Sequence, residues 1–259
     1  MAVKDALLAA CGLAVKVGTI TVCRDLELAL APGECWALLG RNGAGKTTLL
    51  HTLAGLRPAR AGNIYLGGRS LDALPRRETA RRLGLLPQAF DDPFPGTVLE
   101  AALSGRHPHL GLWEWEGAQD VARARQALAR VGLAGFEGRD VRTLSGGERR
   151  RLGLATVLVQ DPAVLLLDEP AGHLDPCHRH RVLELVGALC RENNHSALVS
   201  LHEPELAWRH CTHALVLLGN GETASGPREQ VLTDDVLTRC YDYPMRRLEA
   251  GGQILFQEG

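Results

Sequence analysis

One short segment restricts the fold of this 259-residue chain more than any other. Residues 40–48 read GRNGAGKTT, which matches in full a pattern written GxxxxGKS or GxxxxGKT. The apolar run ALLG precedes it, and KTTLLHTLAGL follows with leucines at helical spacing. The segment therefore joins a buried strand to a helix, and this arrangement predicts an α/β fold built on a parallel sheet.

The chemistry of this loop follows from its glycines, which let the backbone wrap around an anion and point its N–H groups at phosphate oxygens. Lys46 is expected to reach the β and γ phosphates of a nucleotide, and the Thr47 hydroxyl to bind Mg²⁺. The alternative is an ordinary glycine-rich turn, which the flanking strand and helix disfavour. The predicted nucleotide-binding residues here are Gly40, Arg41, Asn42, Gly43, Ala44, Gly45, Lys46, Thr47 and Thr48.

A second apolar run ends in two adjacent carboxylates. Residues 164–167 read VLLL, typical of a strand covered on both faces, and Asp168 and Glu169 follow. Alternation along a strand predicts that the carboxylates point apart, Asp168 toward Mg²⁺ and Glu169 toward the water that attacks the γ phosphate. A strand that simply ends in solvated acids is the alternative, and the glycine loop elsewhere in the chain disfavours it.

Two polar residues beside other strands are candidates for the same site. Gln88 follows the strand-like LGLLP, a position from which its amide would reach Mg²⁺ or the attacking water. His202 follows the apolar run SALVSL, where a neutral imidazole would bond the γ phosphate or orient the water and Glu169. The alternatives are an ordinary surface glutamine and one ordinary histidine among the ten that the chain contains.

A second candidate anion site lies about a hundred residues after the first. Residues 143–151 read TLSGGERRR, and Ser145, Gly146 and Gly147 precede an expected helix of about fifteen residues. The serine hydroxyl, the first N–H groups and the helix dipole all favour an anion there. A plain N-cap with Glu148 in the first turn fits the local sequence equally well, so the local sequence leaves the choice open.

The remaining segments predict how the chain is organised. LAVKVGTITVCRDLELAL alternates like half-buried strands, residues 97–160 read as helices without a strand, and a hairpin is expected at Asn220-Gly221. A helix with Pro176 near its start and a strand pair after residue 244 complete the pattern. We expect one domain, with a core of about residues 1–90 and 161–259 and a helical insertion of about residues 91–160.

Composition restricts the function class. A formal net charge of -1 argues against a general nucleic-acid binder, because such proteins need a basic field. Seven scattered cysteines without a CxxC pair fit a reducing cytosol. The apolar stretch at residues 6–15 is too short to span a bilayer, so no membrane-crossing segment is expected.

In sequence order, GRNGAGKTT, Gln88, LSGGE, LLLDEP, AGHLD at 171–175 and His202 resemble the full motif set of the ATP-binding cassette (ABC) ATPases. The resemblance covers nearly the whole chain. It implies a P-loop NTPase (RecA-like) core with an N-terminal antiparallel β subdomain and an inserted α-helical subdomain. It also implies hydrolysis of ATP with Mg²⁺ in a homodimer whose copies face head to tail, with each ATP lying between one copy's P-loop and the other's LSGGE helix.

This resemblance assigns roles to individual residues of the chain. Those implied in catalysis are Lys46, Gln88, Glu169 and His202, and those implied at Mg²⁺ are Thr47, Gln88 and Asp168. The signature residues Ser145, Gly146, Gly147 and Glu148 would bind the ATP of the second copy, and the turn at Asp175 would connect the two sites. One position departs from the family, because Val17 stands where an aromatic residue usually stacks on adenine, and we therefore name no adenine-contacting residue.

The stretch TVLEAALSGRHPHLG at 97–111 and the tail YPMRRLEAGGQILF resemble importer ATPases that serve ferric siderophores, haem and cobalamin. This implies a peripheral subunit on the cytoplasmic face of the inner membrane, beneath an integral membrane permease that an external solute-binding protein supplies, with no nucleic-acid partner. The solute itself is not expected to contact the chain. A soluble ABC ATPase acting on nucleic acid or the ribosome, and a regulatory module without turnover, are the alternatives.

Overall fold

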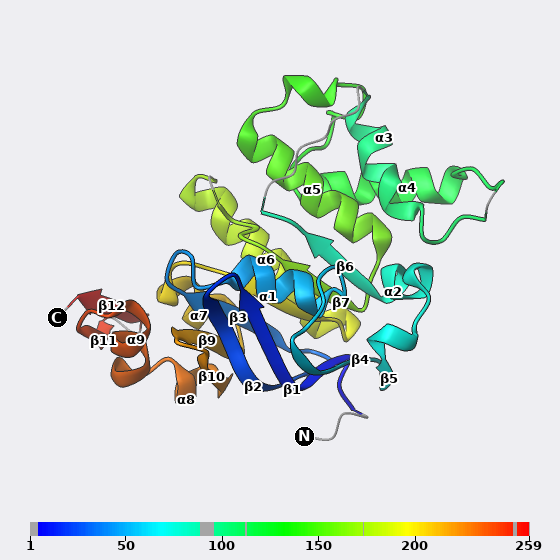
Figure 1. The fold of residues 1–259 in the computed structure, drawn as a ribbon. Helices are drawn as coiled ribbons and strands as arrows, with labels where there is room; N and C mark the ends of the chain where they lie inside the picture. Colours follow the sequence, from blue (N-terminus) through cyan, green and yellow to red (C-terminus); the bar gives the residue numbers. More distant parts are fainter. Residues whose placement is uncertain (1–4, 89–95, 112, 173, 251–252, 259) are drawn as a thin grey trace.

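A six-stranded sheet of order β10-β9-β3-β8-β7-β6 organises the computed structural model, which describes residues 5–88, 96–111, 113–172, 174–250 and 253–258 (Figure 1). The five strands from β9 to β6 pair in parallel, and β10 pairs antiparallel with β9. The predicted parallel sheet is therefore confirmed. Its strands are β3 (Cys35–Gly40), β6 (Leu83–Leu86), β7 (Val164–Leu167), β8 (Ser196–Ser200), β9 (His213–Gly219) and β10 (Glu222–Pro227).

A second, antiparallel sheet of order β2-β1-β4-β5 lies against one face of the first. Its main pair joins β1 to β2 from Leu8 opposite Leu30 to Val17 opposite Ile20, as the alternation near the start of the chain predicts. These strands are β1 (Leu8–Val17), β2 (Ile20–Leu30), β4 (Ala61–Leu66) and β5 (Arg69–Ser70).

The central sheet separates two hydrophobic cores because alternate residues of its strands point to opposite faces. On β3, Trp36 and Leu38 join the core that contains α1 (Lys46–Leu53) and the antiparallel sheet. Ala37 and Leu39 join the other core, beneath α6 (Pro176–Asn193) and α7 (Pro204–His210). A sheet covered on both faces leaves the ends of its strands as the place where polar chemistry reaches solvent.

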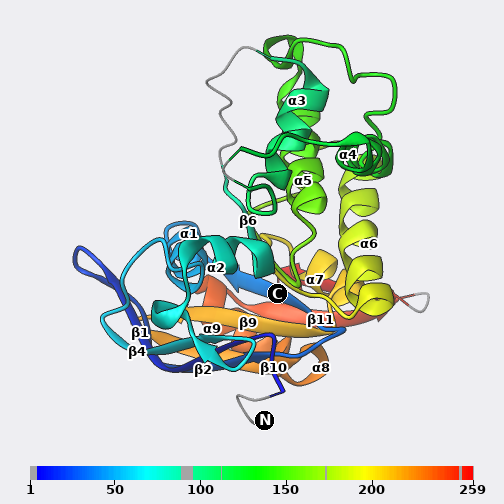
Figure 2. The same cartoon turned by 90° about the vertical axis from the view of Figure 1, so that its right-hand side faces the viewer.

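The described residues between 96 and 160 form helices and turns, with one isolated bridge between Thr97 and Asp140. Thr97 begins the first helix with a capping box, accepting from Glu100 N at 3.2 Å while its own N–H donates to Glu100 Oε2 at 2.7 Å. Figure 2 shows this helical region standing away from the two sheets. Its helices are α3 (Val98–Leu103), η2 (Ser104–Arg106), α4 (Ala118–Arg130), η3 (Val141–Thr143) and α5 (Gly146–Gln160).

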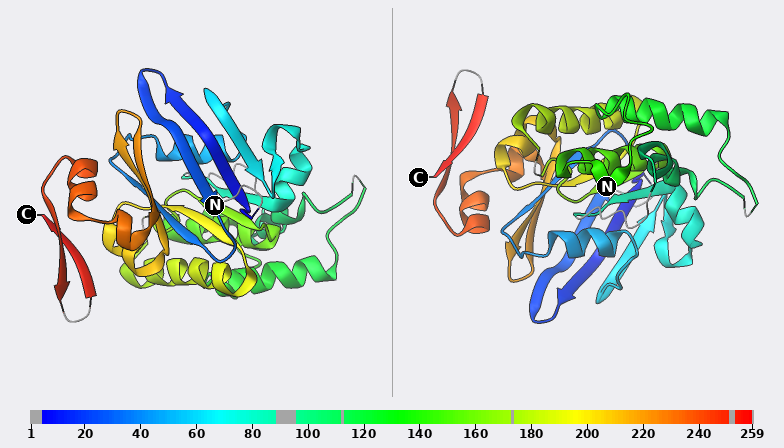
Figure 3. Two further views of the ribbon diagram at one scale, coloured as in Figure 1. Left: turned by 90° about the horizontal axis from the view of Figure 1, so that it is seen from below. Right: turned by 90° about the horizontal axis from the view of Figure 1, so that it is seen from above.

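The C-terminal part contains the predicted hairpins together with helices that the sequence pattern did not predict. Asn220 and Gly221 have φ angles of 52° and 83° in the two-residue turn, as expected for an Asn-Gly hairpin. The pair β11 (Met245–Ala250) and β12 (Gln253–Glu258) lies at the edge of the molecule beside α9 (Figure 3). The remaining helices are η1 (Leu71–Ala73), α2 (Arg76–Arg82), α8 (Arg228–Val231) and α9 (Asp234–Tyr241).

Helices α7, α8 and α9 were missed because they contain 7, 4 and 8 residues. Segments of about two turns or less carry too few apolar positions to establish a helical period. Within the described residues, no helix combines the length and the apolar character that crossing a bilayer requires.

Helices α6 and α7 meet at a pair of histidines. His180 Nδ1 and His210 Nε2 are 2.9 Å apart, so one ring donates a hydrogen bond to the other. Burial, together with the neighbouring His180 and Arg209, lowers the pKa of His210 to about 4, whereas Glu184 opposes the shift. The folded state therefore holds His210 neutral at pH values where an exposed histidine is charged.

This pair predicts acid sensitivity. The unfolded chain protonates His210 near pH 6.5 and the folded chain only near pH 4, so stability is lost as pH falls through that window. His210→Asn should retain about 1 kcal/mol more of its pH 7 stability at pH 5, a discounted figure because the residue is only partly buried. Urea unfolding at both pH values measures this. His107→Asn, at a side chain 70% exposed, is the control, and equal acid losses in both variants would contradict the prediction.

Candidate nucleotide and catalytic site

The glycine loop leaves β3 and enters α1 through Gly45, which has a φ of 97° and occupies the N-cap position. A Cβ there would lie 2.4 Å from Val22 Cγ2, so both the backbone conformation and the space require glycine. Within the described part of the chain, no side chain caps α1 or accepts a hydrogen bond from its first N–H groups. The loop thus presents the positive end of a helix to any anion bound there.

Lys46 is held inside this loop by the loop's own carbonyls. Its Nζ donates to Gly40 O at 2.7 Å and to Arg41 O at 3.3 Å, and the residue is only 6% exposed. Burial lowers the pKa of Lys46, while the nearby carboxylates of Glu169 and Asp168 raise it. A buried ammonium held by two neutral carbonyls is placed to exchange them for charged phosphate oxygens.

A pocket of about 510 Å³ brings the predicted residues of four separate segments together. This volume lies within the usual range for small-molecule sites of roughly 300–1,000 Å³. Gly40, Arg41 and Asp168 are not in its lining, although the first two hold Lys46. The lining residues are Val17, Ile20, Val22, Asn42, Gly43, Ala44, Gly45, Lys46, Thr47, Thr48, Gln88, Glu169 and His202.

The two carboxylates separate, but not for the predicted reason. Strand β7 ends at Leu167, before either of them, so strand alternation does not set their directions. Glu169 instead has a φ of 53°, a left-handed conformation that is rare outside glycine and is found at functional sites. Its Oε1 lies 2.7 Å from Nε2 of His202, and both side chains line the pocket.

The surroundings of Asp168 show whether the residues at this site fit a metal ion. The residue is fully buried, and neither of its carboxylate oxygens has a hydrogen-bond partner among the described residues. A buried carboxylate without a partner is costly, and hard divalent cations bind such oxygens. With the Thr47 hydroxyl and the Gln88 amide at the neighbouring pocket, the residues present fit Mg²⁺. Residues 89–95, which follow Gln88, lie outside the described part of the chain.

The signature segment is located elsewhere. Ser145 begins α5 with a capping box: its hydroxyl accepts from Glu148 N at 3.3 Å, and Glu148 Oε2 accepts from Ser145 N at 2.7 Å. These backbone contacts lower the pKa of Glu148. Ser145 and Gly146 are exposed, and residues 145–148 are not among the residues that line the P-loop pocket.

The opposite end of the pocket is aliphatic. Val17, Ile20 and Val22 from the β1–β2 hairpin line it, and Ile20 is 51% exposed. The family resemblance points to Val17 here but not to Ile20 or Val22. Alternation could have found them, because residues two apart on a strand share a face.

A family model described as ABC transporter matches residues 23–172. That span is more than half of the chain and includes the P-loop, Gln88, the signature segment and both carboxylates. This chain belongs to the ABC transporter family. It is therefore an ATP-binding and ATP-hydrolysing protein with the P-loop NTPase fold.

Individual relatives agree with this assignment. The hemin import ATP-binding protein of Burkholderia thailandensis is 39% identical over 251 residues, covering 90% of this chain and 92% of that protein. The ferric enterobactin transport ATP-binding protein of Escherichia coli is 36% identical over 232 residues, covering 88% and 84%. A solved metal-chelate type ABC transporter in an inward-facing conformation superposes with a TM-score of 0.83 at 26% identity, covering 97% and 96%.

The aliphatic end of the pocket generates a prediction about the nucleotide base of ATP. An aromatic contact adds about 0.5–1.5 kcal/mol beyond aliphatic burial. Val17→Tyr should therefore lower the Kd for ATP by roughly 2- to 10-fold, measured by titration calorimetry. Lys16→Tyr puts the same ring on the exposed neighbouring position of β1 and should change nothing. Equal effects of the two variants, or none from Val17→Tyr, would remove Val17 from the base site.

Proposed function

We propose that this chain is the ATPase subunit of a bacterial importer for a metal-chelate solute of the ferric siderophore, haem or cobalamin type. The relatives named for hemin and ferric enterobactin support the solute class. In this proposal the chain is a homodimer, peripheral on the cytoplasmic face of the inner membrane, and bound to a separate permease that an external solute-binding protein supplies.

One observation supports the proposed dimer. The P-loop pocket gathers Lys46, Gln88, Glu169 and His202, whereas the capped and exposed start of α5 at Ser145 lies outside it. A helix start that offers N–H groups to solvent is suited to an anion supplied from outside the chain. A second copy in head-to-tail orientation supplies that anion as the phosphates of its own ATP, so each ATP is bound by two chains.

In the proposed mechanism, Glu169 polarises the attacking water and His202 orients Glu169 across the 2.7 Å contact. Lys46 stabilises charge on the transferred phosphoryl group, and Gln88 senses the γ phosphate from its own loop. Thr47, Asp168 and Gln88 would hold Mg²⁺, which when bound would supply positive charge to neutralise the phosphates. Residues 145–148 contribute N–H groups to the ATP of the second copy.

The division into a core and a helical insertion at about residues 91–160 is part of the same proposal.

Asp175 accepts from His178 N at 3.0 Å and caps α6, and this contact lowers the pKa of its carboxyl. A capped helix start directly after the AGHLD turn gives that turn a rigid support. In the dimer, the turn would connect the two ATP sites.

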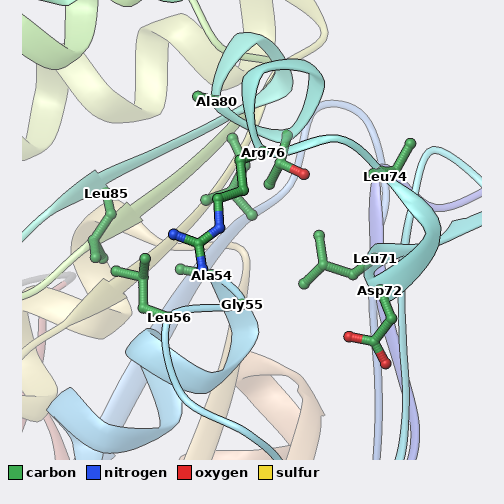
Figure 4. A pocket seen from close by; sticks show the side chains of 11 residues that line it. Ala54, Gly55, Leu56, Leu71, Asp72, Leu74, Arg76, Ala80 and Leu85 are labelled. Carbon is green, nitrogen blue, oxygen red and sulfur yellow. The ribbon is translucent and has the colours of Figure 1, made fainter.

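A pocket of about 510 Å³ on the core is the proposed docking place for the permease. It is lined by the end of α1, by η1, by α2 and by β6, and Figure 4 shows Leu56, Leu85 and Ala54 around the guanidinium of Arg76. Leu56 is 65% exposed although it is apolar. The neighbouring helix α2 also holds the 97–111 segment, because Arg77 and Arg81 donate to Pro108 O at 2.9 and 2.7 Å.

The dimer is tested by trapping ATP. Glu169→Gln should bind ATP without hydrolysing it and should form an ATP-dependent dimer, measured by light scattering. Adding Ser145→Ala should weaken that dimer by roughly tenfold or more, because hydrogen bonds to charged groups contribute about 1.5–3 kcal/mol. Ser104→Ala, at another exposed serine, is the control. Native-rate hydrolysis by Glu169→Gln, or full wild-type activity as a dilute monomer, would overturn the proposal.

Permease docking is tested separately by co-purification. Leu56→Asp places a charge in the apolar pocket and should reduce recovery of the multi-span permease at least tenfold while ATP binding stays unchanged. Leu255→Asp, at a leucine 44% exposed on the C-terminal hairpin, is the matched control. Undiminished recovery with Leu56→Asp would place the permease elsewhere, and failure of the wild-type chain to retain any permease would favour the soluble alternative.

A further inference from the structure

Arg150 is an arginine inside helix α5 that is only 7% exposed. It contacts the backbone of two segments of the catalytic site, residues 87–88 and residues 168–169. Its Nε donates to Glu169 O at 3.1 Å, and its Nη1 donates to Gln88 O at 2.8 Å. Nη1 and Nη2 also donate to Pro87 O and Asp168 O. One side chain thus holds four carbonyls from two separate segments.

These are two of the segments that carry the proposed catalytic side chains. Gln88 follows β6, and Asp168 and Glu169 follow β7, its parallel neighbour in the sheet. Because Arg150 bonds their backbone only, the side chains of Gln88 and Glu169 stay free to line the pocket. Arg150 does not line that pocket itself, so it can affect ATP only by positioning other residues.

The chemistry of arginine suits this position. A guanidinium offers five N–H donors in a rigid plane, whereas lysine offers a single nitrogen and glutamine a single NH₂ group. Burying a cation against neutral carbonyls is costly, although the carboxylates of Asp168 and Glu169 nearby favour its charge. A neutral apolar side chain of similar volume would fill the space without burying a charge, so packing alone does not account for arginine here.

The same helix begins at Ser145, the residue proposed to meet the ATP of the second copy. Arg150 is five residues further on, about 7.5 Å along the axis at the rise of an α-helix. Helix α5 also packs on β6. A displacement of the start of α5 is therefore transmitted through a short rigid element to Gln88 and Glu169.

We propose that Arg150 is a positioning residue that couples the two ATP sites of the dimer. Contact between the start of α5 and the ATP of one copy shifts α5, and Arg150 transfers that shift to the catalytic backbone of its own copy. The inference rests on the proposed head-to-tail dimer. It adds a physical route by which occupancy of one site alters the chemistry at the other.

The test is the ATP dependence of hydrolysis in the full-length chain. Arg150→Gln should lower kcat about tenfold, since small displacements of catalytic groups cost one to two orders of magnitude, and the Hill coefficient should fall to about 1. The Kd for ATP should change less than about twofold, because no ATP contact is removed. Arg150→Lys should have a kcat and a Hill coefficient between those of the wild type and Arg150→Gln. It provides the same test if Arg150→Gln does not fold.

Arg151→Gln is the matched control. Arg151 is the next residue on α5 and also holds backbone, donating to Val131 O at 3.0 Å and Gly132 O at 2.8 Å, but it contacts neither β6 nor β7 segment among the described residues. It should keep the wild-type Hill coefficient. Loss of cooperativity in both variants, or parallel loss of ATP binding in Arg150→Gln, would reduce Arg150 to a structural role and overturn the proposal.

A double-mutant cycle separates this inference from the proposed function. Ser145→Ala should slow hydrolysis in the wild-type background but have little further effect in Arg150→Gln. If Ser145→Ala has no effect in the wild type, the dimer proposal itself fails. If its effect is undiminished in Arg150→Gln, the dimer stands and the coupling through Arg150 is wrong.

Discussion

The uncapped first turn of α1 is the constraint on which the site depends. Its N–H groups have no side-chain partner among the residues that the structure describes, and Gly45 at the N-cap must be glycine because Val22 fills the space where a Cβ would stand. The β1–β2 hairpin therefore packs against the phosphate-binding loop through Val22, and its residues Val17, Ile20 and Val22 form the aliphatic end of the pocket. A bound phosphate accepts hydrogen bonds from the first N–H groups of α1, and its position determines where the rest of the nucleotide lies.

Around this helix start, the fold buries charges that reduce its own stability. Lys46, Arg150 and Asp168 are all at most 7% exposed, and both carboxylate oxygens of Asp168 lack a described partner. Burial of charge without a close ion pair is costly, so Lys46 and Asp168 are explained by ligand binding, and Arg150 by its bonds to the backbone of the catalytic segments. They lie at the carboxyl ends of parallel strands, where backbone carbonyls converge and the two hydrophobic cores end.

The sequence predicted the features that depend on neighbouring residues. The P-loop between strand and helix, the VLLL strand before Asp168 and the Asn220-Gly221 turn all follow from short-range rules of steric freedom and alternation. The left-handed backbone of Glu169 and the grip of Arg150 on Gln88 O were not predictable in this way. The bonds of Arg150 to Glu169 O and Gln88 O join residues 19 and 62 positions apart in the sequence. The local periodicity of the sequence does not indicate such contacts.

The sequence leaves an N-cap and an anion site as alternatives for Ser145 at the start of α5, and the structure shows the N-cap. The Ser145 hydroxyl accepts a bond from Glu148 N and keeps its own proton free to donate. Glu148 turns its carboxylate back to Ser145 N, and Arg139 lies 3.6 Å from the other oxygen. The capping box therefore does not exclude an anion at this helix start, because the Ser145 proton stays free and Arg139 partly offsets the charge of Glu148.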